Sequence, residues 1–388
     1  MHALYFQRQR SRCEKEMSKK ILITGGAGFI GSHLADHLLE QGFNVRVLDN
    51  LSVQVHGADS PRPPYLHRDV ELHCGDVRDT DALKKALNGI DAIFHFAACV
   101  GVGQSMYQIA HYTSVNNQGT ANLLQTLIEH PVERLIVASS MSVYGEGLYR
   151  GHDGRLVAGR ERSLEQLQAH DWELRNVEGA ILEPVVTPET KPPSLASIYA
   201  LSKFDQEQMC LIFGRAYRIP TVALRFFNVY GTRQALSNPY TGVLAIFASR
   251  LLNDKAPTIF EDGLQRRDFV SVKDVAQACR LALQSPQAAG NVFNVGSGRN
   301  FTICEIAEKI SEAMGKASTE PQISGKYRVG DIRHCFADIT RAKEVLGYEP
   351  QVRFEDGLLE LVEWLEGQPA DDKGDQAGAE LSARGLTV

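Results

Sequence analysis

Residues 21–50 read ILITGGAGFIGSHLADHLLEQGFNVRVLDN, and this stretch decides the fold of the chain. It begins with a short apolar run that suits a buried strand of a parallel sheet. A glycine-dense turn follows, and apolar residues then recur at helical spacing from Phe29 until Gly42. A second apolar run at residues 45–48 predicts another strand, which ends at Asp49. The stretch therefore predicts a strand, a turn, a helix and a second strand.

Three glycines lie where a bound dinucleotide requires them. Gly25 permits the tight turn, Gly28 lets the backbone approach a pyrophosphate, and Gly31 lets the helix pack against the strand. The phosphates would lie at the helix N-terminus, where free N–H groups and the helix dipole favour negative charge. Asp49 follows at the distance expected for a carboxylate on a ribose 2′-hydroxyl, which predicts NAD rather than NADP. The alternative is that the glycines only form the turn between strand and helix.

Length and composition limit the class of protein. The 388 residues, 43% of them hydrophobic, suit one large or two coupled α/β domains. A net charge of −6 gives no broad basic surface, so we expect no nucleic-acid partner. The seven scattered cysteines form no CxxC pair, which fits a reducing cytoplasm without zinc or disulfides. No apolar run has the length of a transmembrane helix, so we expect a cytoplasmic protein with no membrane partner.

Strands and helices continue to alternate beyond Asp49, which predicts a Rossmann-like, doubly wound parallel sheet with a smaller C-terminal α/β substrate domain. Strand ends near residues 49, 76, 97 and 139 should share the sheet edge that binds ligands. The expected organisation is an N-terminal extension of no catalytic importance at residues 1–16, a NAD-binding domain at 17–225 with an insertion at about 146–196, a mainly substrate-binding domain at 226–366 with segments that return to the first domain, and a disordered tail at 367–388.

Two further segments carry residues suited to catalysis. Residues 139–145, SSMSVYG, follow a predicted strand, and Tyr199 and Lys203 share one face of a predicted helix. A lysine one turn from a tyrosine lowers the pKa of the phenol by placing positive charge beside the phenolate. Such a tyrosine can exchange protons with a sugar hydroxyl near neutral pH. A lone YxxxK also occurs on solvated helix faces, so this pair gains its meaning from the dinucleotide pattern that precedes it.

The order of these motifs resembles that of the extended short-chain dehydrogenases/reductases, and in particular their NAD-dependent nucleotide-sugar epimerases and dehydratases. The likeness covers roughly residues 18–366. The shared motifs are TGGAGFIG at 24–31, Asp49, Gly75-Asp76-Val77, HFAA at 95–98, Asn116 with Gly119-Thr120, SSxSVYG and YxxxK.

The resemblance implies roles for individual residues. Tyr199 would be the catalytic base and acid, Lys203 would hold the nicotinamide ribose, and Ser140 would bond the reacting sugar oxygen. The implied NAD site comprises Gly25, Gly28, Phe29, Ile30, Gly31, Asp49, Asn50, Asp76, Val77, Phe96, Ala97, Ala98, Asn116, Tyr199 and Lys203. The implied nucleotide-sugar site comprises Ser140, Asn228, Asn238, Val243, Arg267 and Arg328. Two arginines that converge on a diphosphate suit guanidinium chemistry, although either one alone could equally form a surface ion pair.

The chain departs from the family pattern at three positions. Dehydratases of this group carry Asp-Glu directly after the catalytic Thr, whereas this chain has Met141 and Ser142. Neither side chain can act as the acid or base of a dehydration, so epimerisation is favoured. Galactose epimerases have a lysine near the cofactor phosphates where this chain has Val100, which indicates a different arrangement of phosphate contacts.

The insertion between Tyr144 and Tyr199 resembles that of the dTDP-L-rhamnose 4-epimerase subgroup. Members of the subgroup often carry two cysteine pairs here, but this insertion contains no cysteine, so we expect no thiolate-bound metal. We interpret His152, Asp153 and His170 as solvated loop residues rather than metal ligands.

These observations predict an NAD-dependent isomerase that inverts C4 of a nucleotide sugar through a transient 4-keto intermediate. The subgroup likeness favours dTDP-L-rhamnose, converted to dTDP-6-deoxy-L-talose for polysaccharide biosynthesis. A UDP-hexose or UDP-hexuronate 4-epimerase, a reductase that releases its cofactor, and a non-catalytic NAD sensor remain alternatives. A sensor has no need of Ser140, Tyr199 and Lys203 together. The family likeness also implies a homodimer formed through helices at about 116–130 and 197–218.

Overall fold

The computed structural model describes residues 19–57, 61–236, 238, 240, 242–328, 330–368, 372 and 374–387. The extension predicted at residues 1–16 lies outside the described residues. Among the helices of the described part, none is long and apolar enough to cross a membrane.

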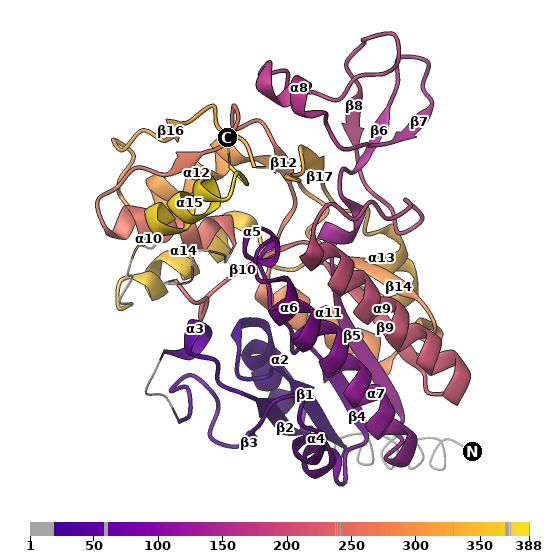
Figure 1. Ribbon diagram of the computed structural model, residues 1–388. Helices are drawn as coiled ribbons and strands as arrows, with labels where there is room; N and C mark the ends of the chain where they lie inside the picture. Colours follow the sequence, from indigo (N-terminus) through magenta and orange to yellow (C-terminus); the bar gives the residue numbers. More distant parts are fainter. Residues whose placement is uncertain are drawn as a thin grey trace, which may run out of the picture.

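A seven-stranded parallel sheet, in the order β14-β9-β5-β4-β1-β2-β3, forms the centre of the fold (Figure 1). The strands are β1 (Lys20–Thr24), β2 (Asn44–Asp49), β3 (Glu71–Cys74), β4 (Ala92–His95), β5 (Arg134–Ser140), β9 (Thr221–Phe226) and β14 (Val292–Val295). The order reverses between β1 and β4, which is the switch point of a doubly wound sheet. The predicted Rossmann-like fold is confirmed, and the predicted strand ends do share one edge.

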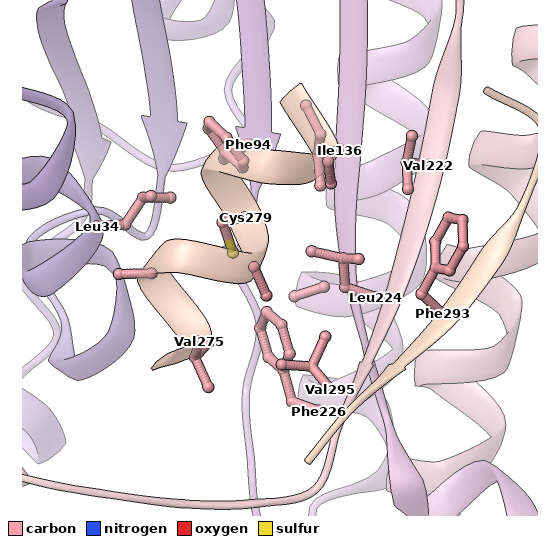
Figure 2. Close-up of a cluster of buried hydrophobic side chains, with 14 of the residues drawn as sticks. Leu34, Phe94, Ile136, Val222, Leu224, Phe226, Val275, Cys279, Phe293 and Val295 are labelled. Carbon is pink, nitrogen blue, oxygen red and sulfur yellow. The ribbon is translucent and has the colours of Figure 1, made fainter. Parts of the chain in front are cut away.

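Helices cover both faces of the sheet, which explains why its strands are apolar without alternation. On one face lie α2 (Phe29–Glu40) and α11 (Val272–Gln284), and on the other lie α4 (Thr80–Leu87), α7 (Gly119–Glu129) and α9 (Ile198–Tyr217). In β1, Ile21 and Ile23 pack into the first core and Leu22 into the second. Figure 2 shows Val275 and Cys279 of α11 packed on the first face.

Short helices lie around the ligand-binding edge. After β2 the chain forms α3 (Val53–His56), a single-turn helix. Two more single-turn helices, α5 (Val102–Ser105) and α6 (Ile109–Tyr112), follow β4. The helix predicted from residue 116 begins earlier, as a π-helical turn at Thr113–Gln118 that continues into α7.

The smaller domain has its own core between three helices, α10 (Val243–Leu252), α12 (Ile303–Ala313) and α14 (Phe354–Leu365). Its short strands are β10 (Asn228–Tyr230), β11 (Thr258–Ile259), β12 (Arg266–Arg267), β13 (Phe269–Ser271), β15 (Phe301–Thr302), β16 (Gln322–Ile323) and β17 (His334–Cys335). A further helix, α13 (Thr340–Leu346), packs near β14 of the central sheet.

The insertion folds as a small antiparallel sheet of β6 (Leu148–Arg150), β7 (Leu156–Ala158) and β8 (Glu183–Val185), with α8 (Leu164–Gln168) beside it (Figure 1). Buried ion pairs attach it to the smaller domain. Arg333 has no exposed side-chain surface, and its guanidinium lies 2.5 Å from Glu173 of the insertion and 2.6 Å from Asp262. Arg162 of the insertion likewise contacts Glu261 at 2.8 Å.

The prediction of a disordered tail is wrong for residues 374–387. They include α15 (Gly374–Ala383), which lies against the front of the smaller domain near α5 (Figure 1). Its residue Glu380 accepts hydrogen bonds from Tyr107 at 2.8 Å and Tyr240 at 3.1 Å. Ala377 and Leu381, four residues apart, are buried. An apolar stripe of this kind is hidden in an average composition rich in Asp, Gly and Ala.

Candidate functional site

A cavity of about 520 Å³ opens at the carboxyl edge of the central sheet, where the strand order reverses. Every residue of the predicted NAD site lines it except Asn116. Ser140 and Asn238 of the predicted substrate site line it as well, whereas Asn228, Val243, Arg267 and Arg328 do not. Residues of β2, β5 and α9 and of the segments that follow β1 and β4, far apart in the sequence, therefore meet at one site.

The glycine-rich turn has the shape that a dinucleotide needs. Gly25 has a φ of 69°, and a Cβ added there would lie 2.8 Å from the backbone N of Ala97. A Cβ on Gly31 would lie 2.6 Å from the carbonyl oxygen of Gly25. At Gly28 the nearest atom to an added Cβ is 3.4 Å away, so the backbone is open on this side. The N-terminus of α2 follows with no side-chain cap and no acidic residue in its first turn, which fits a pyrophosphate.

Asp49 is held rigidly at the end of β2. One carboxylate oxygen accepts the N–H of Ala27 at 3.0 Å, and the other accepts that of Leu51 at 2.9 Å. The carboxylate lines the cavity, where it would repel a ribose 2′-phosphate but accept a hydrogen bond from a 2′-hydroxyl. A carboxylate at this position therefore fits NAD rather than NADP.

Asn116 lies behind the cavity wall instead of on it. Its side-chain oxygen accepts the N–H of Cys99 at 2.7 Å, and its amide donates to Ser202 at 2.9 Å. Asn116 is fully buried. It thus holds the chain after β4 against α9, and any effect on the cofactor passes through those elements.

The three predicted catalytic residues come together at the cavity. Ser140 ends β5, while Tyr199 and Lys203 occupy the first turns of α9, which begins at Ile198 after the N-cap Ser197. The hydroxyl of Ser197 caps this helix by accepting the N–H of Ala200 at 3.1 Å. The tyrosine and lysine are thereby aimed at the end of β5.

The pKa of Tyr199 beside Lys203 differs from the value that the sequence predicts. Burial raises the pKa of Tyr199, and a hydrogen bond from Ser140 opposes this rise only in part. Burial also lowers the pKa of Lys203, to about 8, and its ammonium donates a 2.6 Å hydrogen bond to Gln206. The pKa of Tyr199 in this structure therefore lies above its ordinary value and not below it, as the YxxxK spacing had predicted, because burial disfavours the phenolate.

The two predicted phosphate-binding arginines lie in the smaller domain, away from the cavity lining. The guanidinium of Arg267 donates to the backbone carbonyls of Ile332 and Arg333. Arg328 stacks on Phe260, with 4.1 Å between the guanidinium carbon and the ring centroid. The Nε of Arg328 is buried and has no hydrogen-bond partner among the described residues.

Several residues at the cavity were missed from the sequence. Gln54 donates to the side-chain oxygens of Gln104 and Asn238, each at 3.1 Å, and so joins α3, α5 and the smaller domain. Cys99 and His56 also line the cavity. The motif HFAA pointed to Cys99, which follows it directly, but no local pattern distinguishes Gln54 in the short helix α3.

A family model described as "NAD dependent epimerase/dehydratase family" matches residues 21–160 and 179–296. The chain belongs to this family. It is 37% identical to dTDP-L-rhamnose 4-epimerase of Burkholderia thailandensis over 351 residues, which are 89% of this chain and 95% of that relative. It is also 30% identical to a putative UDP-glucose 4-epimerase of Methanocaldococcus jannaschii, with 89% of this chain and 98% of that relative covered.

Solved structures of the same family have the same fold. UDP-glucose 4-epimerase of Thermotoga maritima with UDP-glucose has a TM-score of 0.73 at 33% identity, covering 89% of this chain and 98% of its own. UDP-glucuronic acid 4-epimerase of Bacillus cereus with UDP-glucuronic acid and NAD has a TM-score of 0.70 at 28% identity, covering 89% and 99%. The predictions of an NAD cofactor and of an isomerase of the nucleotide-sugar 4-epimerase type are confirmed.

Proposed function

We propose that this protein inverts C4 of dTDP-L-rhamnose and forms dTDP-6-deoxy-L-talose. The observation that carries the proposal is the convergence of Ser140, Tyr199 and Lys203 on the NAD-type cavity. Met141 and Ser142 follow Ser140, so the acid and base that a dehydration needs are absent from these positions. The relative of this name from Burkholderia thailandensis, similar over 89% of the chain, supports this choice of sugar.

The side chains divide the proton chemistry between them. Tyr199 takes the proton of the 4-hydroxyl and returns it when the opposite epimer forms. Ser140 accepts hydrogen bonds from the N–H of Ser142 at 3.2 Å and from its hydroxyl at 2.9 Å, so its own proton is free to be donated toward the cavity. In this structure that proton is directed to Tyr199, and with substrate bound it would bond the reacting sugar oxygen. NAD held in the cavity would supply reversible hydride transfer at C4 of the sugar. No net redox change results.

The smaller domain would hold the nucleotide and diphosphate. We assign this role to Asn228, Asn238, Val243, Arg267 and Arg328. Buried polar atoms without partners support part of the assignment, because such atoms are costly unless a ligand pairs with them. They are the side-chain oxygen of Asn228 and the Nε of Arg328, considered within the described residues.

A homodimer is also part of the proposal. Ile128 of α7 and three residues of α9 (Leu201, Ile212 and Tyr217) are between 42% and 54% exposed. Large apolar side chains left exposed on two adjacent helices are a reason to look for an interface there. Sedimentation of the purified protein would show a mass near 86 kDa, twice the 42.9 kDa chain, if the pair of helices self-associates.

The decisive experiment is NMR of the purified protein with dTDP-L-rhamnose and no added cofactor. A second 6-deoxy sugar that differs only at C4 would establish the reaction, the substrate and the retained NAD together. Turnover of UDP-glucose or UDP-glucuronate alone would keep the mechanism and reject this sugar. Inertness toward every nucleotide sugar, despite bound NAD, would favour the sensor.

A further inference from the structure

Lys203 is hydrogen-bonded to a glutamine, Gln206, that has no role in the reaction scheme above. The Nζ of Lys203 donates a 2.6 Å hydrogen bond to the side-chain oxygen of Gln206. Gln206 has no exposed surface, and Lys203 is 3% exposed. Among the described residues, Gln206 is the hydrogen-bond acceptor found for this ammonium. A buried ammonium needs such an acceptor, because desolvation disfavours its charge.

The orientation of Gln206 is fixed by a chain of hydrogen bonds that starts at β1. The hydroxyl oxygen of Thr24 accepts the N–H groups of Phe96 and Ala97, each at 3.2 Å. Its own proton is therefore directed to Nδ1 of His95, 2.8 Å away. Burial lowers the pKa of His95 to about 3, so the ring is neutral and carries its proton on Nε2.

The chain continues to Gln206 through Thr120. The Nε2–H of His95 donates to the hydroxyl of Thr120 at 2.9 Å, and that hydroxyl donates to the carbonyl oxygen of Asn116 at 2.5 Å. Thr120 then accepts a second bond, at 2.8 Å, from the side-chain nitrogen of Gln206. The nitrogen end of the amide thus faces Thr120 and the oxygen end faces Lys203. The reverse orientation would place an N–H₂ group against an ammonium.

We propose that Gln206 is a positioning residue for the epimerisation, which holds the ammonium of Lys203 at the cavity wall one turn from Tyr199. The proposal rests on the function proposed above for Lys203. It connects the lysine to β1, the strand that leads into the glycine-rich turn, so that the lysine and the cofactor cradle keep one geometry. Gln206 itself does not line the cavity and acts only through Lys203.

The charged and titratable groups around Lys203 are few. Glu207 and Cys210 of the same helix favour its charged form, and His95 of β4 faces it in the neutral form. Tyr199 is the fourth group, one turn before it on α9. Glu207 is already paired with Arg225, at 2.7 Å, and with Ser139. Loss of the Gln206 oxygen would therefore leave the ammonium without an equivalent acceptor.

The test compares Gln206→Met with Gln206→Glu and with the control Gln208→Met on the same helix. Gln208 is half-buried and its side chain bonds Glu207 instead, at 3.2 Å. We expect Gln206→Met to lower kcat about tenfold or more with KM nearly unchanged, the effect of losing a hydrogen bond to a charged group. Gln206→Glu should restore most of kcat, because it keeps an acceptor for Lys203. Gln208→Met should match the wild type.

The pH profile separates positioning from a general loss of structure. Removal of the acceptor favours the neutral amine, so the alkaline limb of kcat should move to lower pH in Gln206→Met. The alkaline limb should move to higher pH in Gln206→Glu. If Gln206→Met does not fold, the shift in Gln206→Glu alone tests the positioning role of Gln206. An unchanged alkaline limb in both variants would overturn the proposal, as would equal losses in Gln206→Met and Gln208→Met.

A second readout does not require turnover. NMR of ¹³Cε-labelled lysine in the NAD-bound protein, with Lys203→Met for assignment, follows the titration of Lys203 directly. The proposal requires the Lys203 titration to move down in Gln206→Met and up in Gln206→Glu. If the wild type epimerises no nucleotide sugar but these shifts occur, the proposed function fails and the Lys203–Gln206 coupling stands. If the wild type epimerises a nucleotide sugar but the Lys203 titration does not shift in the variants, the proposed function stands and the Lys203–Gln206 coupling fails.

Discussion

The hydroxyl of Ser142 donates a 2.9 Å hydrogen bond to the hydroxyl oxygen of Ser140. Ser142 occupies one of the two positions where dehydratases of the family carry an acid, and here it orients a serine. Because Ser140 would bond the reacting oxygen directly, Ser140→Ala should lower kcat about 100-fold. Ser142→Ala removes only a neutral supporting bond and should lower kcat by less than about tenfold. Steady-state kinetics with dTDP-L-rhamnose measures both, and equal losses would contradict these roles.

Tyr199→Phe should abolish epimerisation while the protein keeps its NAD. The variant lacks the group that exchanges the 4-hydroxyl proton, which is worth about 10²–10⁴ in rate. The ring still fills the cavity wall, so folding should be unaffected. Tyr217→Phe, on the exposed C-terminal end of the same helix, is the matched control and should retain full activity. Turnover and bound NAD are measured on the same samples, and an active Tyr199→Phe would reject the mechanism.

Asp49→Asn should weaken NAD binding about tenfold and reduce the preference for NAD over NADP. The carboxylate is lost as a charged acceptor for the ribose and as a repulsive group for a 2′-phosphate. Asp79→Asn is the control, since Asp79 caps α4 through the N–H groups of Asp81 and Ala82 and lies outside the cavity. Titration of cofactor-free protein with both dinucleotides gives the affinities. An unchanged NAD/NADP ratio would mean that Asp49 does not contact the ribose.

Arg333→Met should reduce the free energy of unfolding by about 3–5 kcal/mol. The substitution leaves the buried carboxylate of Glu261, 3.0 Å from the guanidinium, and those of Glu173 and Asp262 without their common cation. Arg299→Met is the control. Arg299 is exposed and forms a surface ion pair with Glu355 at 3.7 Å, which should contribute little to stability. Urea unfolding of the two variants makes the comparison. If Arg333→Met and Arg299→Met had the same free energy of unfolding, the ion network around Arg333 would not anchor the insertion.

The same network should make stability depend on acid. Burial favours the neutral form of Glu173, but hydrogen bonds from His334 and Arg333 prevail and hold its pKa at about 2, below the usual 4.5. The stabilisation is complete above about pH 4.5 and is lost as the pH falls toward 2, because the unfolded chain takes up the proton first. Glu173→Gln should therefore lose less stability than the wild type between pH 5 and pH 3. Parallel acid dependence in urea unfolding would contradict this assignment.

The local parts of the fold and site could be predicted from the sequence. The glycine spacing, Asp49 and the YxxxK pair lie within short segments, and their geometry follows from strand and helix periods alone. They predicted the sheet and the NAD cofactor correctly, and the three proposed catalytic side chains line the cavity. The insertion was recognised by its length, but its antiparallel sheet was not, because its central strand at residues 148–150 pairs with residues 183–185 across a long separation.

Tertiary structure decided what depends on partners distant in the chain. Asn116 was expected at the cofactor but is used by Cys99 and Ser202, and no local pattern could show that competition. Burial, which only the assembled core creates, raises the pKa of Tyr199 where the sequence predicted a lowered one. The same core brings the side-chain oxygen of Gln206 to the ammonium of Lys203. Backbone geometry and hydrophobic periodicity are local in the chain, so the fold class and the cofactor could be predicted from the residues alone. Side-chain ionisation and orientation were left to the tertiary structure, because desolvation and hydrogen-bond competition depend on every neighbour at once.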